Sequence, residues 1–241
     1  MKFIKLFEEQ TAFDEAKSTL DRPNVSLIKT NRNVYSLTEG GVNANGHSYV
    51  DLGLPSRLKW ATMNVGATSE TDYGDYFMWG STTRNTADDC IWADAPFNNG
   101  SDSYNEEYFN AHKSEWLDSK DNLKPEFDAA RAIMGGDWRM PTKAEIQELI
   151  DYTTNKWFAN YNGTGVSGTK FTGSNGTSIF IPASGDRFGP SFGSQGSQVN
   201  VWSSSLDTLD PNDAWNLNVD SVSADAVSNL RFNGFAVRGV L

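Results

Sequence analysis

The segment that most constrains the fold is residues 135–145, GGDWRMPTKAE, because it connects the end of one helix to the start of another. Its glycine pair is typical of a helix C-cap. The residues before it form an apolar stripe at helical spacing: Phe127, Ala130, Ile133 and Met134. Thr142 and Glu145 then form the capping-box pattern of a second helix. The inward-facing residues that this second helix predicts are Ile146, Leu149 and Ile150.

Short apolar or alternating stretches predict strands on both sides of these helices. They are residues 49–53, 58–63, 178–182, 199–202, 214–219 and 235–237. Residues 66–115 are rich in Gly, Asp, Asn and aromatic side chains with little periodicity, which indicates a long organised loop. Residues 163–168 match the pattern GxGxxG, but turn-like sequence follows where a dinucleotide site needs a helix. The chain is therefore expected to be an α+β protein with long organised loops.

Length and composition exclude several functional classes. The 241 residues suffice for one large domain or two small ones. A net charge of −11 argues against nucleic-acid binding. No apolar run approaches the ~20 residues of a membrane span, and the N-terminus lacks the apolar region of a secretory signal. One cysteine, Cys90, and two histidines exclude an internal disulfide and disfavour a zinc site.

Residues 1–40 differ from the rest and are interpreted as an N-terminal arm, followed by one domain over 41–241. A short helix is expected near residues 11–20, with extended pieces at 24–29 and 33–36. The arm has too few apolar residues for a core of its own. Two interpretations remain open: it folds back on the domain, or it docks on a partner.

No pattern of catalytic residues stands out. The serines after Trp202 lack a nucleophile elbow, and Glu145 and Glu148 are expected on the outer face of their helix. The acidic loop 207–213 could supply oxygen ligands to calcium, but it lacks the pattern of an EF-hand. Tryptophans can also stack on sugars, yet four aromatic residues are assigned to the core: Trp138, Trp202, Trp215 and Phe235. We expect no enzymatic activity, no metal and no cofactor.

Several blocks occur together in a recognisable order: NGHSYVDLGLPS (45–56), LKWATMNVGA (58–67), YGDYFMWG (73–80), DAA (128–130), the GGDWRMPT segment, WSSS (202–205) and the closing GFAVR (234–238). Residues 45–241 thereby resemble the Fibrobacter succinogenes major paralogous domain, common in Bacteroidetes and their phages. The resemblance implies a C-type-lectin-like fold, in which the terminal strands pair, two helices flank a sheet and long loops carry a binding surface. Formylglycine-generating enzymes share the broad fold but use paired cysteines, which Cys90 alone does not provide.

The arm resembles, over a short stretch, the N-termini of virion proteins of crAss-like and related Bacteroides phages. With the missing signal segment, this implies a non-enzymatic phage virion surface protein, a head fibre or capsid decoration protein. Residues 1–40 would bind the capsid or another virion protein, or form a homo-oligomer, most simply a trimer. The domain would contact a host-surface protein or glycan, without nucleic acid and without membrane insertion. The alternative is a bacterial cell-surface or secreted lectin-like binding module.

The fold analogy places a binding surface on loops of the C-terminal half. The candidate ligand-binding residues are Arg187, Phe188, Phe192, Asp213, Arg231 and Asn233.

Overall fold

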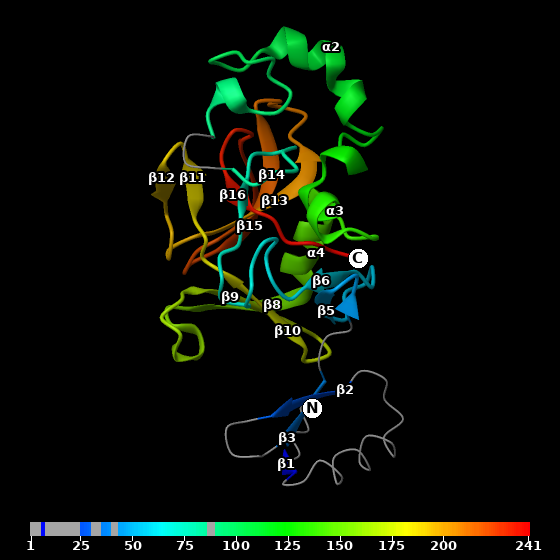
Figure 1. The fold of residues 1–241 in the computed structure, drawn as a ribbon, viewed down its shortest axis with the longest axis vertical. Coiled ribbons are helices and arrows are strands. Elements are labelled where there is room, and N and C mark those ends of the chain that lie inside the picture. Colours follow the sequence, from blue (N-terminus) through cyan, green and yellow to red (C-terminus); the bar gives the residue numbers. More distant parts are fainter. Residues whose placement is uncertain (1–5, 8–24, 30–34, 40–42, 86–89) are drawn as a thin grey trace.

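The computed structural model describes residues 6–7, 25–29, 35–39, 43–85 and 90–241. In the arm, β1 (Leu6–Phe7), β2 (Val25–Lys29) and β3 (Tyr35–Glu39) form an antiparallel sheet in the order β1-β3-β2 (Figure 1). The extended pieces predicted at 24–29 and 33–36 are confirmed, the first to within one residue and the second to within three. The helix expected at 11–20 lies outside the described residues.

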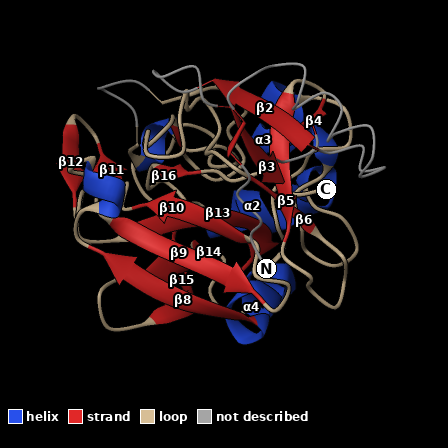
Figure 2. Cartoon of the chain, turned by 90° about the horizontal axis from the view of Figure 1, so that it is seen from below, coloured by secondary structure: helices blue, strands red, loops and turns tan. Residues whose placement is uncertain are grey.

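The centre of the larger part of the chain is a five-stranded sheet in the order β15-β14-β13-β16-β7 (Figure 2). Its strands are β7 (Tyr76–Phe77), β13 (Val199–Leu206), β14 (Asp213–Val219), β15 (Ala224–Leu230) and β16 (Phe235–Ala236). Neighbouring strands are antiparallel except β13 and β16, which pair in parallel between Val201 and Ala236. The result is a mixed α+β protein, built mostly of sheets, as the sequence predicts.

The two ends of residues 43–241 meet in a second sheet. It consists of β4 (Asn43–Ala44), β5 (His47–Asp51) and β6 (Lys59–Ala61). Lys59 and Leu241 each donate a 3.0 Å backbone hydrogen bond to the other. The last residues of the chain, just beyond β16, thus extend this sheet along β6.

The α-helices within the described residues are α2 (Glu106–Trp116), α3 (Ala129–Met134) and α4 (Lys143–Tyr152). Both expected features of the helix junction are confirmed. Gly135, with φ of 68°, forms the C-cap of α3, and Thr142 and Glu145 complete a capping box on α4. Helix α2 was not expected, although Asn105 accepts a hydrogen bond from the amide of Tyr108 as an N-cap. None of the helices in the described part of the chain is long and apolar enough to cross a bilayer.

Two smaller β units complete the structure. One is a meander in the order β10-β9-β8, made of β8 (Thr153–Phe158), β9 (Gly168–Gly173) and β10 (Ser178–Pro182). The last glycine of the GxGxxG pattern opens strand β9, so no helix follows that pattern. The other unit is the hairpin of β11 (Asp186–Phe188) and β12 (Ser191–Gly193).

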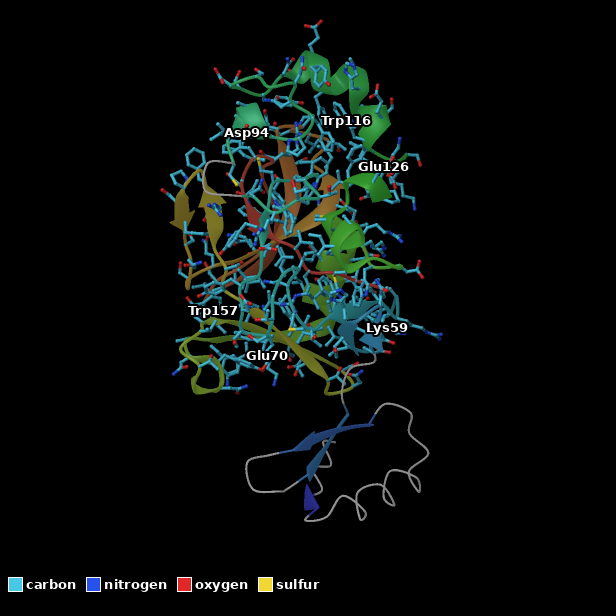
Figure 3. All side chains as sticks on the ribbon, viewed as in Figure 1. Lys59, Glu70, Asp94, Trp116, Glu126 and Trp157 are labelled. Carbon is cyan, nitrogen blue, oxygen red and sulfur yellow. The ribbon has the colours of Figure 1, made fainter. Side chains whose placement is uncertain are left out.

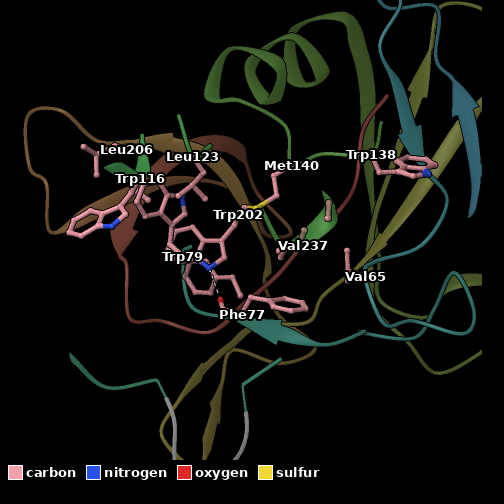
Figure 4. Close-up of a cluster of buried hydrophobic side chains, with 14 of the residues drawn as sticks. Val65, Phe77, Trp79, Trp116, Leu123, Trp138, Met140, Trp202, Leu206 and Val237 are labelled. Atoms are coloured by element: carbon pink, nitrogen blue, oxygen red, sulfur yellow. Dashed lines mark hydrogen bonds between the residues drawn. The ribbon is translucent and has the colours of Figure 1, made fainter. Parts of the chain in front are cut away.

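Side chains fill the interior in two main apolar clusters. One surrounds Trp79, Trp138 and Trp202, close to α2 and α3 (Figure 4). The other surrounds Trp60, between α4 and the sheets. Figure 3 shows Trp116 toward one end of the part formed by residues 43–241 and Trp157 toward the other.

Buried tryptophans are tied to the backbone by their indole N–H groups. Trp202 donates to the carbonyl of Phe77 at 2.8 Å (Figure 4). Trp138 donates to the carbonyl of Ala44 at 2.9 Å. The assignment of Trp138, Trp202 and Phe235 to the core is therefore confirmed.

The assignment of Trp215 to the core is wrong. This side chain is only half-buried, and it belongs to neither apolar cluster. Its neighbours along β14, Ala214 and Asn216, are fully buried, so Trp215 projects from the opposite face of the strand. There the ammonium of Lys143 covers its ring.

Candidate functional site

The β11–β12 hairpin carries three of the six candidate residues. Arg187 pairs with Phe192, and Phe188 pairs with Ser191. The side chain of Phe188 is 54% exposed and that of Phe192 is 50% exposed. The Arg187 guanidinium lies 5.1 Å from the centroid of the Phe192 ring. Arg187 itself is half-buried, and its guanidinium donates to the carbonyls of Gly189 and Asn85. The hairpin therefore exposes Phe192 beside Arg187 on one face and Phe188 on the other.

Contacts at its base fix the hairpin to the rest of the protein. Arg187 donates a backbone hydrogen bond to Gly234 at 2.8 Å and accepts one from Gly234 at 2.9 Å. The ring of Phe192 lies 5.3 Å from that of Tyr76, and the ring of Phe188 lies 5.5 Å from that of Phe232. These contacts hold the exposed rings in place before any ligand arrives, which lowers the entropic cost of binding.

A cavity of about 330 Å³ opens beside the hairpin. The residues that line it are Gly74, Asp75, Tyr76, Arg84, Asn85, Arg187 and Phe192. Arg84 is exposed and lies 3.8 Å from the Asp75 carboxylate. The Tyr76 hydroxyl donates to the carbonyl of Ser184 at 2.6 Å, and burial raises the pKa of Tyr76 to about 12. The cavity thus combines aromatic surface with two guanidinium groups, a combination that suits a ring bearing polar or anionic substituents.

Arg231 does not lie at this surface. It is fully buried, and its guanidinium sits among aromatic rings, 4.3 Å from the centroid of Phe109 and 5.3 Å from that of Tyr104. Burial lowers the pKa of Arg231 to about 10. The interpretation of Arg231 as a ligand contact is not supported, because its side chain is inaccessible to solvent.

Asp213 and Asn233 lie apart from the hairpin cavity. Burial, with the nearby charges of Asp210 and Asp207, raises the pKa of Asp213 to about 6. Asn233 is half-buried in a turn, where its amide donates to the carbonyl of Leu230 at 2.9 Å. Of the candidate residues, the structure brings together Arg187 and Phe192 at the cavity. Phe188 lies on the opposite face of the same hairpin, and the other three lie outside the cavity.

Sequence reasoning missed Tyr76, Arg84 and Asn85. They are more than a hundred residues from the hairpin in sequence, and the pairing of β7 with β16 brings them beside it. Tyr76 belongs to the YGDYFMWG block, but nothing in the block itself points to residue 187.

Two acids expected on the outer face of α4 have structural partners instead. The Glu145 carboxylate accepts hydrogen bonds from Arg139 at 2.5 and 2.7 Å and from the amide of Thr142 at 2.8 Å. Burial alone would raise the pKa of Glu145, but these hydrogen bonds and the Arg139 charge hold it below its usual value. Glu148 accepts hydrogen bonds from the amide and the hydroxyl of Ser56.

In the described part of the chain, no three His, Cys, Asp or Glu side chains gather as they would around a metal ion. Asp207, Asp210 and Asp213 interact through their charges, but they do not form such a group.

A scan against models of protein families found no match to this chain. A search of curated proteins and a search of solved structures found no match either.

Proposed function

We propose that the chain is a non-enzymatic phage virion surface protein, a head fibre or capsid decoration protein. The observation that carries the binding part of this proposal is the β11–β12 hairpin, on which Phe192 lies half-exposed beside Arg187 and Phe188 lies half-exposed on the opposite face. Large apolar side chains exposed together on a fixed support are typical of contact surfaces. The partner on this face is a protein or glycan of the host surface.

The proposed fold of residues 41–241 is C-type-lectin-like. Support comes from the meeting of the two ends of the domain, where Lys59 pairs with Leu241. Further support comes from long organised segments around a central sheet with few helices. The hairpin lies on this C-terminal half, where the resemblance places the binding surface.

Residues 1–40 attach the protein to the capsid or to another virion protein, and they join copies into a homo-oligomer, with a trimer favoured. The strands described in this arm pair with one another. Many copies on one particle let weak individual contacts add up, since multivalent display raises avidity by ~10²–10⁴. The net charge of −11 disfavours binding to the genome.

The experiment measures adsorption of the full-length protein to cells of the host of the encoding phage. The variants are Phe188→Ser with Phe192→Ser, and a matched control, Tyr152→Ser, which removes an exposed aromatic ring from the end of α4. We expect the double variant to lose adsorption at least about tenfold and the control to keep it, since both hairpin rings are contact residues. Equal adsorption of all three proteins contradicts the proposed binding face.

A further inference from the structure

A second cavity, of about 880 Å³, lies away from the hairpin. It opens between the N-terminal turn of α4, the end of β13 and the loop before α3. It shares no lining residue with the hairpin cavity. In Figure 1 the hairpin lies at the left and helices α3 and α4 at the right. The groove is therefore a second surface whose role is independent of the proposed host contact.

One wall of the groove is the ring of Trp215, which the flexible side chain of Lys143 covers. Trp215 is half-buried, and the Lys143 ammonium lies 3.0 Å from the centroid of its ring. Next to them, Ser205 accepts a hydrogen bond from the Lys143 amide at 2.9 Å and donates one to the Asn122 side chain at 2.6 Å. The backbone of Lys143 is thus fixed while its long side chain can turn away from the ring.

The carboxylates that line the groove are already engaged. Asp118 accepts hydrogen bonds from the amides of Lys120 and Asn122, and Asp207 accepts one from the amide of Leu209. Asp128 accepts from two further backbone amides. Glu145 is paired with Arg139.

The two lysines of the groove are not engaged in this way. Lys120 and Lys143 form no ion pair with any residue that the structure describes. The carboxylates of the groove thus accept hydrogen bonds from the protein, whereas the two ammonium groups are left to pair with a ligand.

We infer that this groove binds an oligosaccharide that carries carboxylate groups. The C–H face of a sugar ring packs on an aromatic side chain such as Trp215, and sugar hydroxyls match the serine and asparagine groups beside it. A neutral sugar that took the ring face would displace Lys143 and leave its ammonium without a partner. A carboxylated sugar replaces the lost cation–π contact with an ion pair, so the charge of the ligand decides its affinity.

The test is a calorimetric titration of the full-length protein with oligogalacturonate, hyaluronan oligosaccharides and alginate oligomers. The fully methyl-esterified oligogalacturonate is the matched ligand, because it keeps the rings and removes the charges. We expect saturable binding of at least one carboxylated oligosaccharide, and binding of the ester weaker by roughly tenfold or more. Added salt should weaken the binding of the charged form.

Substitutions place the site within the protein. Lys143→Met and Lys120→Met should each weaken binding of the carboxylated ligand about tenfold, and Trp215→Leu should weaken it at least as much. The matched control is Lys156→Met, because Lys156 also covers an aromatic ring, Phe158, at 5.1 Å but lies outside the groove. The control should bind as the wild type does.

Three results overturn the inference: no saturable binding of any of the three carboxylated ligands, equal affinity for the acid and its ester, or binding unchanged in Lys143→Met and Trp215→Leu. The Phe188→Ser, Phe192→Ser protein should bind the oligosaccharide normally. If it alone fails to bind, the ligand occupies the hairpin instead, and the groove inference fails while the proposed host contact stands.

Discussion

The guanidinium of Arg238 donates a 2.8 Å hydrogen bond to Oδ1 of Asn64, a residue 174 positions earlier in the chain. Arg238 is fully buried and also donates to the carbonyls of Ala61 and Phe180. A buried cation needs acceptors to offset its lost hydration. These bonds tie the closing GFAVR segment to the start of the domain and to β10.

Asn64→Ala removes one acceptor from this buried cation. We expect a loss of about 1.5–3 kcal/mol in the free energy of unfolding, the range for hydrogen bonds to charged groups. Urea unfolding measures it. Asn155→Ala, at an exposed position of β8, is the control and should change stability by less than ~0.5 kcal/mol. Equal stability of both variants would contradict this role of Asn64.

Trp138→Ala should destabilise the protein by ~3–5 kcal/mol, because it empties a fully buried site in the apolar cluster. It also leaves the carbonyl of Ala44 without the indole donor. Thermal unfolding provides the measurement. Leu209→Ala serves as control because Leu209 is 95% exposed. An unchanged melting temperature for Trp138→Ala would show that the core assignment is incorrect.

Arg231→Met should loosen the packing of α2 on the sheet. Arg231 contacts the rings of Phe109 and Tyr104 and donates to the carbonyl of Pro211 at 2.8 Å. Desolvated cation–π contacts contribute about 2 kcal/mol. Hydrogen exchange should become faster over residues 104–116 while that of β8–β10 stays unchanged. Uniformly faster exchange would instead indicate global destabilisation.

Asp213 makes stability depend on pH. Its pKa is raised from 3.8 to about 6 in the folded protein. The folded state then binds this proton more tightly than the unfolded state, so the contribution is complete below pH 3.8 and is lost as the pH rises through about 6. Asp213→Asn cannot titrate. Its melting temperature relative to the wild type should therefore rise between pH 4 and pH 7, and a constant difference over that range would contradict this.

How far the sequence predicts the structure depends on whether the signal is local. The capping box at Thr142 and the glycine C-cap at Gly135 are set by neighbouring residues, and both are confirmed. The start of α2 also had a local signal in Asn105 and the acids after it, but aromatic and polar residues hide its periodicity. Trp215 was misassigned because a strand pattern does not say what covers each face.

The candidate site also combines features set by neighbouring residues with features set by residues distant in sequence. The fold analogy named Arg187, Phe188 and Phe192. The short hairpin pairs Arg187 with Phe192, but it pairs Phe188 with Ser191, so the two aromatic rings lie on opposite faces. Arg231 was interpreted as a loop cation, but rings from segments distant in sequence surround its guanidinium: Trp79, Trp92, Tyr104 and Phe109. The cavity residues Tyr76 and Arg84 depend on the pairing of β7 with β16, which sequence spacing does not encode.

The most direct test of the proposed function is immunogold imaging of purified virions of the encoding phage. Particles carrying the full-length protein are compared with particles made with a variant that lacks residues 1–40. The proposal predicts gold on the particle surface with the full-length protein and none with the truncated one, although both proteins are present in the lysate. Particles without label in both preparations would contradict a virion location and favour the bacterial cell-surface binding module.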